Sequence, residues 1–109
     1  MARFQTMAGG NDYQDIAASQ SNVVLARASA SAGGGVGDYL SHVLVIPETV
    51  AAGTISVQDG SATAVNIFIA GTLPSLVPFA IPVQSYSVNG AWKITTGANV
   101  HVRAVGNFS

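Results

Sequence analysis

Residues 85–108, SYSVNGAWKITTGANVHVRAVGNF, decide the fold class, because they consist of strand patterns separated by turn signals. In the segment AWKITT (residues 91–96), Trp92 and Ile94 share one face and polar residues take the other. The segment VHVRAVGNF (residues 100–108) alternates in the same way. A period of two is typical of a strand that buries one face. The stretch therefore predicts a β protein whose last strands line a core.

Asn89 and Gly90 form the strongest turn signal in the chain. Both residue types accept the positive φ angles of a type I′ turn, so the pair predicts a β-hairpin between the segments on either side of it. Trp92 follows two residues later, and a single tryptophan in an alternating strand usually anchors a core. Trp92, Asn89 and Gly90 are therefore predicted to be core and turn anchors.

Further strand patterns occupy the middle of the chain, separated by Gly, Pro, Asn and Asp. They cover residues 22–31, 39–47, 54–58, 64–71 and 79–84. The pair 54–58 and 64–71 predicts a hairpin through the turn signal at residues 59–61, and Pro82 predicts that 79–84 is an edge strand. About eight short strands and no helical period predict an all-β, antiparallel β-sandwich, with a jelly roll as the specific topology.

The first 22 residues differ from the rest and predict an extended N-terminal arm, followed by a β domain over residues 23–109. The arm is polar and has no sustained period, and such segments often become ordered on a partner. An amphipathic helix over residues 12–20 is the alternative. The apolar side chains expected to anchor the arm to a partner are Phe4, Met7, Tyr13 and Ile16.

Charged side chains are scarce, at 8% of the residues and a net charge of −1, whereas soluble proteins average about 25%. A neutral surface suits burial against other copies, since charges would have to be desolvated or paired there. A monomer with an uncharged polar surface is the alternative. Four scattered basic residues predict no direct nucleic-acid partner. No apolar segment approaches the ~20 residues that span a bilayer, and no signal peptide is evident, so we expect synthesis in the cytoplasm.

The sequence predicts no catalytic residues, no cofactor and no metal site. The chain has no cysteine, and His42 and His101 lack the spacing of a metal-ligand pair. Both histidines occur in strand patterns, where a packed or interface position is expected. Asp38 and Asp59 stand beside glycines, as turn-capping acids do, and a small hydrolase built on them is a disfavoured alternative. A sugar-binding platform of Trp92 with tyrosines is a second alternative.

Two segments carry a resemblance to a known group of proteins. YLSHVLVIPETVAAGTISVQDGSATAVNIFIAG (residues 39–71) and PFAIPVQSYSVNGAWKITTGANVHVRAVGNF (residues 78–108) resemble a family of small structural proteins of tailed bacteriophages and prophages. The most specific part is NGAWKITTGANV, residues 89–100.

The resemblance implies a jelly-roll sandwich that forms a homotrimer on the outer surface of an icosahedral head, as a capsid decoration (cement) protein or as the base of a head fibre. The partners would be further copies of the chain and the major capsid protein, and the location the virion of a phage made in a bacterial cytoplasm. The chain ends at Ser109 without a repetitive shaft, which favours decoration. The alternatives are a carbohydrate- or host-surface-binding module and a head-fibre or tail-associated module. Either the arm or loops such as Gly33–Asp38 would contact the shell.

Overall fold

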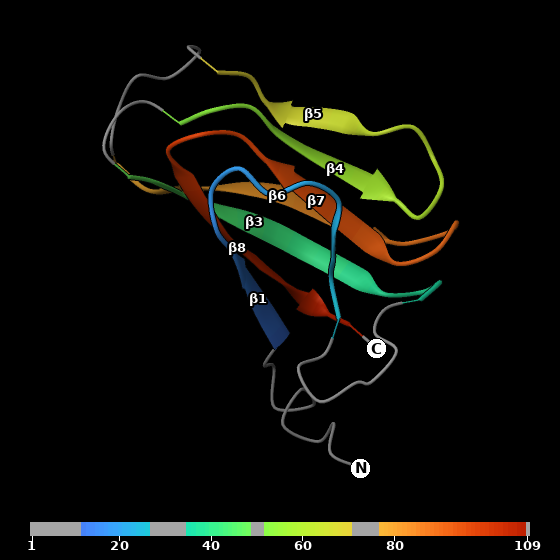
Figure 1. Cartoon of the computed structure of the whole chain (residues 1–109). Coiled ribbons are helices and arrows are strands. Elements are labelled where there is room, and N and C mark those ends of the chain that lie inside the picture. The colour runs from blue at the N-terminus through green and yellow to red at the C-terminus, as the bar shows by residue number, and fades with distance from the viewer. Residues whose placement is uncertain (1–11, 27–34, 49–51, 71–76, 109) are drawn as a thin grey trace.

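The protein is built from two antiparallel four-stranded sheets, and the described residues contain no helix (Figure 1). The computed structural model describes residues 12–26, 35–48, 52–70 and 77–108. The strands are β1 (Asp12–Ile16), β2 (Val23–Val24), β3 (Tyr39–Pro47), β4 (Ile55–Asp59), β5 (Val65–Phe68), β6 (Phe79–Tyr86), β7 (Trp92–Thr96) and β8 (Val100–Asn107). The all-β, antiparallel class predicted from the sequence is confirmed.

Sheet A has the strand order β1-β8-β3-β6, and sheet B has the order β2-β7-β4-β5. The pairing is nested along the chain, because β1 pairs with β8, β2 with β7, β3 with β6 and β4 with β5. Chain neighbours from β1 to β4 therefore lie in alternate sheets, as do those from β5 to β8. The edge strands β5 and β6 lie on one lateral side of the sandwich, where the Phe68 and Phe79 rings meet, and β1 and β2 lie on the other, where Gln14 bonds to Val24.

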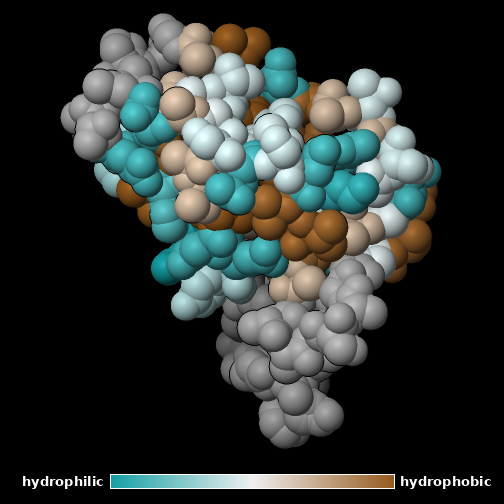
Figure 2. Space-filling view, viewed as in Figure 1, coloured by the Kyte–Doolittle hydropathy of each residue, from teal (hydrophilic) through white to brown (hydrophobic). Residues whose placement is uncertain are grey.

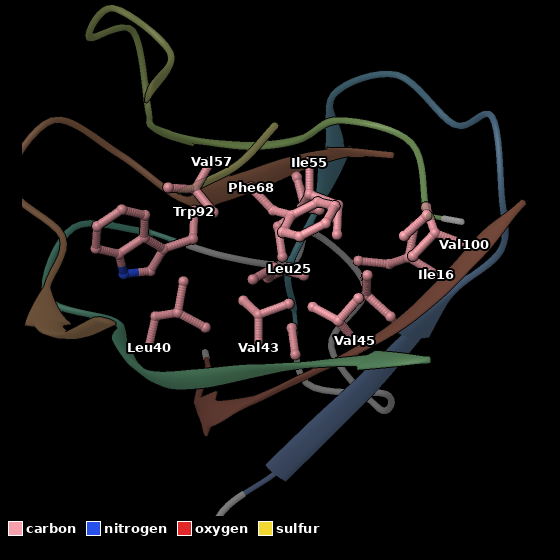
Figure 3. Close-up of a cluster of buried hydrophobic side chains, with 14 of the residues drawn as sticks. Ile16, Leu25, Leu40, Val43, Val45, Ile55, Val57, Phe68, Trp92 and Val100 are labelled. Carbon is pink, nitrogen blue, oxygen red and sulfur yellow. The ribbon is translucent and has the colours of Figure 1, made fainter. Parts of the chain in front are cut away.

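The core lies between the sheets and follows from the alternation of β3, β4, β7 and β8. In β7 the buried positions include Trp92 and Ile94, and in β8 they include Val100 and Val102. Figure 3 shows Trp92 above Leu40 at one end of the cluster and Val100 beside Ile16 at the other. Full burial of each such aliphatic side chain contributes about 1.5–3 kcal/mol.

Several strand predictions agree with the structure. The predicted bounds of the long strand over residues 39–47 are those of β3, and the hairpin through residues 59–61 is β4–β5. β6 is an edge strand, and Pro82 lies in it, where a missing N–H costs no sheet hydrogen bond. In contrast, the strand predicted over residues 22–31 is only two residues long within the described chain.

The predicted type I′ hairpin at Asn89–Gly90 is wrong. β6 pairs with β3 in sheet A, whereas β7 pairs with β2 and β4 in sheet B, so the strands on either side of the turn are in different sheets. Gly90 has a positive φ of 147°, but Asn89 is not among the residues with positive φ. Asn89 and Gly90 therefore lie in the connection that crosses from sheet A to sheet B.

The predicted boundary of the arm also needs correction. Residues 12–16 form β1, which pairs with β8 along its whole length. Ile16 lies in the core at 2% exposure, because its side chain fills the end of the cluster beside Val100 (Figure 3). The β domain thus begins by residue 12 rather than residue 23, and Ile16 cannot serve as an anchor for a partner. Phe4 and Met7 lie outside the described residues.

Candidate functional site

The described residues contain no group of three His, Cys, Asp or Glu side chains that could hold a metal ion. His42 lies on β3 and His101 on β8, in strands that pair with each other. Their register separates them, because His42 is opposite Val105 while His101 is opposite Ile46. The structure therefore places the two histidines on one sheet but does not bring them together.

No helix among the described residues is long and apolar enough to cross a bilayer. The outer face of sheet A carries one continuous row of paired residues across all four strands, in the order Asp15, Arg103, Leu44 and Ala80.

An ion pair forms the charged part of this row. The Arg103 guanidinium donates two hydrogen bonds to Asp15, from Nε to Oδ1 at 2.8 Å and from Nη2 to Oδ2 at 3.2 Å. The same guanidinium lies 4.2 Å from the ring centroid of Tyr13, and His101 Nε2 is 3.8 Å from Asp15 Oδ1. A bidentate pair stacked on an aromatic ring holds both charges in one geometry.

The ion pair changes the protonation of its carboxylate. The hydrogen bond from Arg103 is the main reason why the pKa of Asp15 lies below its ordinary value of 3.8, although partial burial opposes the shift. Asp15 therefore stays ionised at neutral pH and compensates Arg103. The cluster presents Tyr13, 57% exposed, beside a charge pair with no net charge, which suits contact with a protein surface.

The carboxylates of Asp38 and Asp59, the other acids named from the sequence, accept hydrogen bonds from backbone N–H groups. Asp38 is buried, and its Oδ2 accepts a hydrogen bond from the Gly35 backbone N–H at 3.0 Å. Asp59 accepts hydrogen bonds from the backbone N–H groups of Val88 and Asn89. Both acids therefore cap turns, and neither lies beside a histidine in any hydrogen bond of the described residues.

Trp92 takes no part in an aromatic surface platform. It is 7% exposed, and its Nε1–H donates a hydrogen bond of 3.0 Å to the Asp38 carbonyl. Tyr39 and Tyr86 do form a ring pair, with centroids 5.0 Å apart, and Tyr86 is largely exposed. The two tyrosines of the predicted platform therefore lie together, but the tryptophan is not part of it.

Sequence reasoning missed the ion pair between Asp15 and Arg103. The two residues are 88 positions apart, and β1 was predicted to be part of an arm, so nothing local linked them. The sequence of this strand, DYQDI, does not alternate polar and apolar residues, so no local pattern indicated that it is a strand.

Large apolar side chains are exposed on several parts of the surface. They are Tyr13, Val24, Val36, Val65, Ile69, Val77, Tyr86 and Val88. Figure 2 shows a hydrophobic band crossing the middle of the visible face between two zones that are mostly hydrophilic or neutral.

Comparison with known proteins found no match to this chain. This holds for protein-family models, for curated proteins and for solved structures.

Proposed function

We propose that this protein is a structural protein of a tailed-bacteriophage virion, a homotrimeric decoration protein that binds the outer surface of the head and stabilises the shell. The observation that carries the proposal is a β-sandwich whose described residues include eight large apolar side chains exposed on the surface, while only 8% of the chain is charged. Such a surface suits a protein that is covered by neighbours in an assembly. The resemblance of residues 39–71 and 78–108 to phage structural proteins is the reason why we propose a phage virion as this assembly.

The nested strand pairing supports a jelly roll as the topology. A long antiparallel hairpin that is rolled into two layers pairs its first strand with its last, its second with its seventh, and so on inward. The four pairs β1·β8, β2·β7, β3·β6 and β4·β5 follow this scheme. The outer faces of the two sheets are then the broad surfaces that this topology offers for contacts.

A decoration protein binds the shell through several weak contacts that form at the same time. A trimer that binds the shell through three equivalent contacts gains about 10²–10⁴ in avidity over one contact when the geometry allows all three. Because the trimer binds the assembled shell better than free capsid subunits, its binding shifts the equilibrium toward the closed shell. Activity of this kind requires no catalytic group.

Tyr13 is the residue we assign to shell contact, together with the segment that precedes β1. Tyr13 is exposed on edge strand β1, and its ring is held by Arg103. Ordering such an aromatic side chain before binding reduces the entropy lost on association. Loop contacts by residues 33–38 are the alternative placement.

The test uses heads of the phage or prophage that encodes the chain, assembled without this protein. Purified full-length protein should co-sediment with these heads and raise the temperature at which they release DNA. A chain that lacks residues 2–11 should keep its fold, because β1 remains, and should bind at least tenfold more weakly. Tyr13→Ala should also weaken binding, with Val24→Ala as the control on the opposite sheet. Absence of binding by the full-length chain would overturn the proposal.

The second candidate is a carbohydrate- or host-surface-binding module of the virion, which the exposed Tyr86 beside Tyr39 favours. Aromatic rings on a β surface can stack on sugar rings. A glycan array with the full-length protein tests it, and binding that is lost in Tyr86→Ala but kept in Tyr13→Ala would support this candidate over decoration.

A further inference from the structure

The two lateral sides of the sandwich are built differently. On the β1–β2 side, the Gln14 side-chain amide joins the sheets, since its Nε2–H donates to the Val24 carbonyl at 3.2 Å and its Oε1 accepts from the Ala26 N–H at 3.0 Å. The segment after β1 (blue to cyan) crosses in front of the sheets in Figure 1. It is held by bonds from Ser19 N–H to the Gly97 carbonyl and from Leu25 N–H to the Trp92 carbonyl. This side is closed.

The β5–β6 side leaves the core partly uncovered. Of the residues that the structure describes, five hydrophobic ones pack against the core while only partly buried. Four of them lie on these two strands, namely Ile67, Phe79, Ile81 and Val83. Phe68 and Phe79 bridge the strands with ring centroids 5.4 Å apart. Val65 is paired with the buried Val57 and so shares its inward face, yet it is 59% exposed. On this side, the open one, apolar side chains of β5 and β6 therefore stay in contact with solvent.

The segment from Gly60 to Trp92 contains no charged residue and no histidine. This uncharged segment contains both strands of the open side and the connections on either side of β6. Proteins usually protect a sheet edge with charges, proline or a bulge. β6 has Pro82 and a register shift opposite Leu40–His42. β5 has a register shift opposite Ile55–Ser56 but neither a charge nor a proline.

We infer that the β5–β6 side is the surface that binds a second copy of this chain. A partner that carried charges here would have to desolvate them without a counter-ion, because this side offers none. The chain itself, with its charge-poor surface, supplies a matching neutral partner. The inference rests on the self-assembly in the proposed function and deepens it by naming the contact surface.

The geometry of this side suits closure around a three-fold axis. A three-fold contact joins two different patches, one from each neighbour, and the side provides two, the β5 half and the β6 half. With these sides turned toward a common axis, the β5 half of each copy meets the β6 half of the next. β6 has eight residues, which span about 26 Å, and β5 has four, which span about 13 Å, so the length of β5 limits the contact between the two strands.

The experiment compares Val65→Glu with Val24→Glu in the full chain. Both valines are exposed on edge strands at opposite ends of sheet B, at 59% and 41%, so either carboxylate can reach water in a single copy. Light scattering across a concentration series gives the molar mass, and circular dichroism confirms that each variant is folded. We expect the wild-type chain and Val24→Glu to reach three times 11.0 kDa.

Val65→Glu should remain folded but raise the concentration at which half of the chains assemble by on the order of a hundredfold, since it places an uncompensated charge in the contact. The inference would be overturned if Val65→Glu assembled like the wild type, or if Val24→Glu weakened assembly as much as Val65→Glu. Neither result would contradict the proposal that the wild-type chain is a trimer. If Val65→Glu remained a trimer but no longer bound heads, the β5–β6 side would be the surface that contacts the shell. This result would also overturn the inference. A wild-type dimer that Val65→Glu dissociates would support the inference but contradict the proposed trimer.

Discussion

Asp59 and Asn89, thirty residues apart in the chain, are joined by a 3.1 Å hydrogen bond from the Asn89 backbone N–H to Asp59 Oδ1. The same carboxylate accepts bonds from the Val88 N–H at 3.1 and 2.9 Å. Asp59 ends β4, and Asn89 lies between β6 and β7. The contact therefore holds the crossing between the sheets against the β4–β5 turn, where the sequence predicted an independent hairpin.

Replacing Asp59 by Ala should lower the free energy of unfolding by about 1–2 kcal/mol, because hydrogen bonds to a charged group are lost on a partly exposed surface. Asp59→Asn keeps one acceptor oxygen and should lose about half as much. Chemical denaturation at one protein concentration measures both. Equal stability of Asp59→Ala and the wild type would contradict a role of the carboxylate in this crossing.

Gly60→Ala should be far more damaging than Gly37→Ala. Both glycines have positive φ, 56° and 92°, so both variants incur a cost of about 1 kcal/mol in that backbone region. A Cβ at Gly60 would also overlap the Asn89 carbonyl group, whereas a Cβ at Gly37 meets nothing within 4 Å. Thermal melts should show a loss of more than about 3 kcal/mol, or no folding, for Gly60→Ala only. A similar small loss in both variants would exclude the close backbone approach.

The fluorescence of Trp92 should report the core directly, since it is the single tryptophan of the chain. Its indole lies above Leu40 and donates to the Asp38 carbonyl (Figure 3). We expect weak quenching by acrylamide in the native protein and strong quenching in denaturant. Strong native quenching would indicate an exposed ring and would favour the aromatic binding platform instead.

The ion pair between Asp15 and Arg103 should make stability depend on acid pH. Because the folded-state pKa of Asp15 is lower than its ordinary 3.8, its contribution is present above that value and is lost as the pH falls through the lower folded-state pKa. Both side chains are about two-fifths exposed, so solvent screens the pair and its contribution is small. Asp15→Asn should be slightly less stable than the wild type at pH 7, and the difference should disappear as the pH falls below the folded-state pKa of Asp15. A difference that is constant with pH would contradict the pairing.

Local alternation predicted much of the fold. The bounds of β3, the β4–β5 hairpin, the edge position of β6 and the inward faces of β7 and β8 could be predicted, because each depends on residues within a few positions. β1 was missed because an edge strand of five residues with two acids is hard to distinguish from a polar arm. Its register with β8 depends on Ile16 entering a core that is built mostly from residues after position 39.

The sequence alone determined that the chain is an antiparallel β protein with a charge-poor surface, since composition and a period of two are properties of neighbouring residues. Only the tertiary structure decided which strands pair, where Asn89–Gly90 leads and which side of the sandwich remains open. These depend on contacts between residues far apart in the chain. A turn that favours a hairpin locally is overruled when both of its strands bury more apolar surface in different sheets.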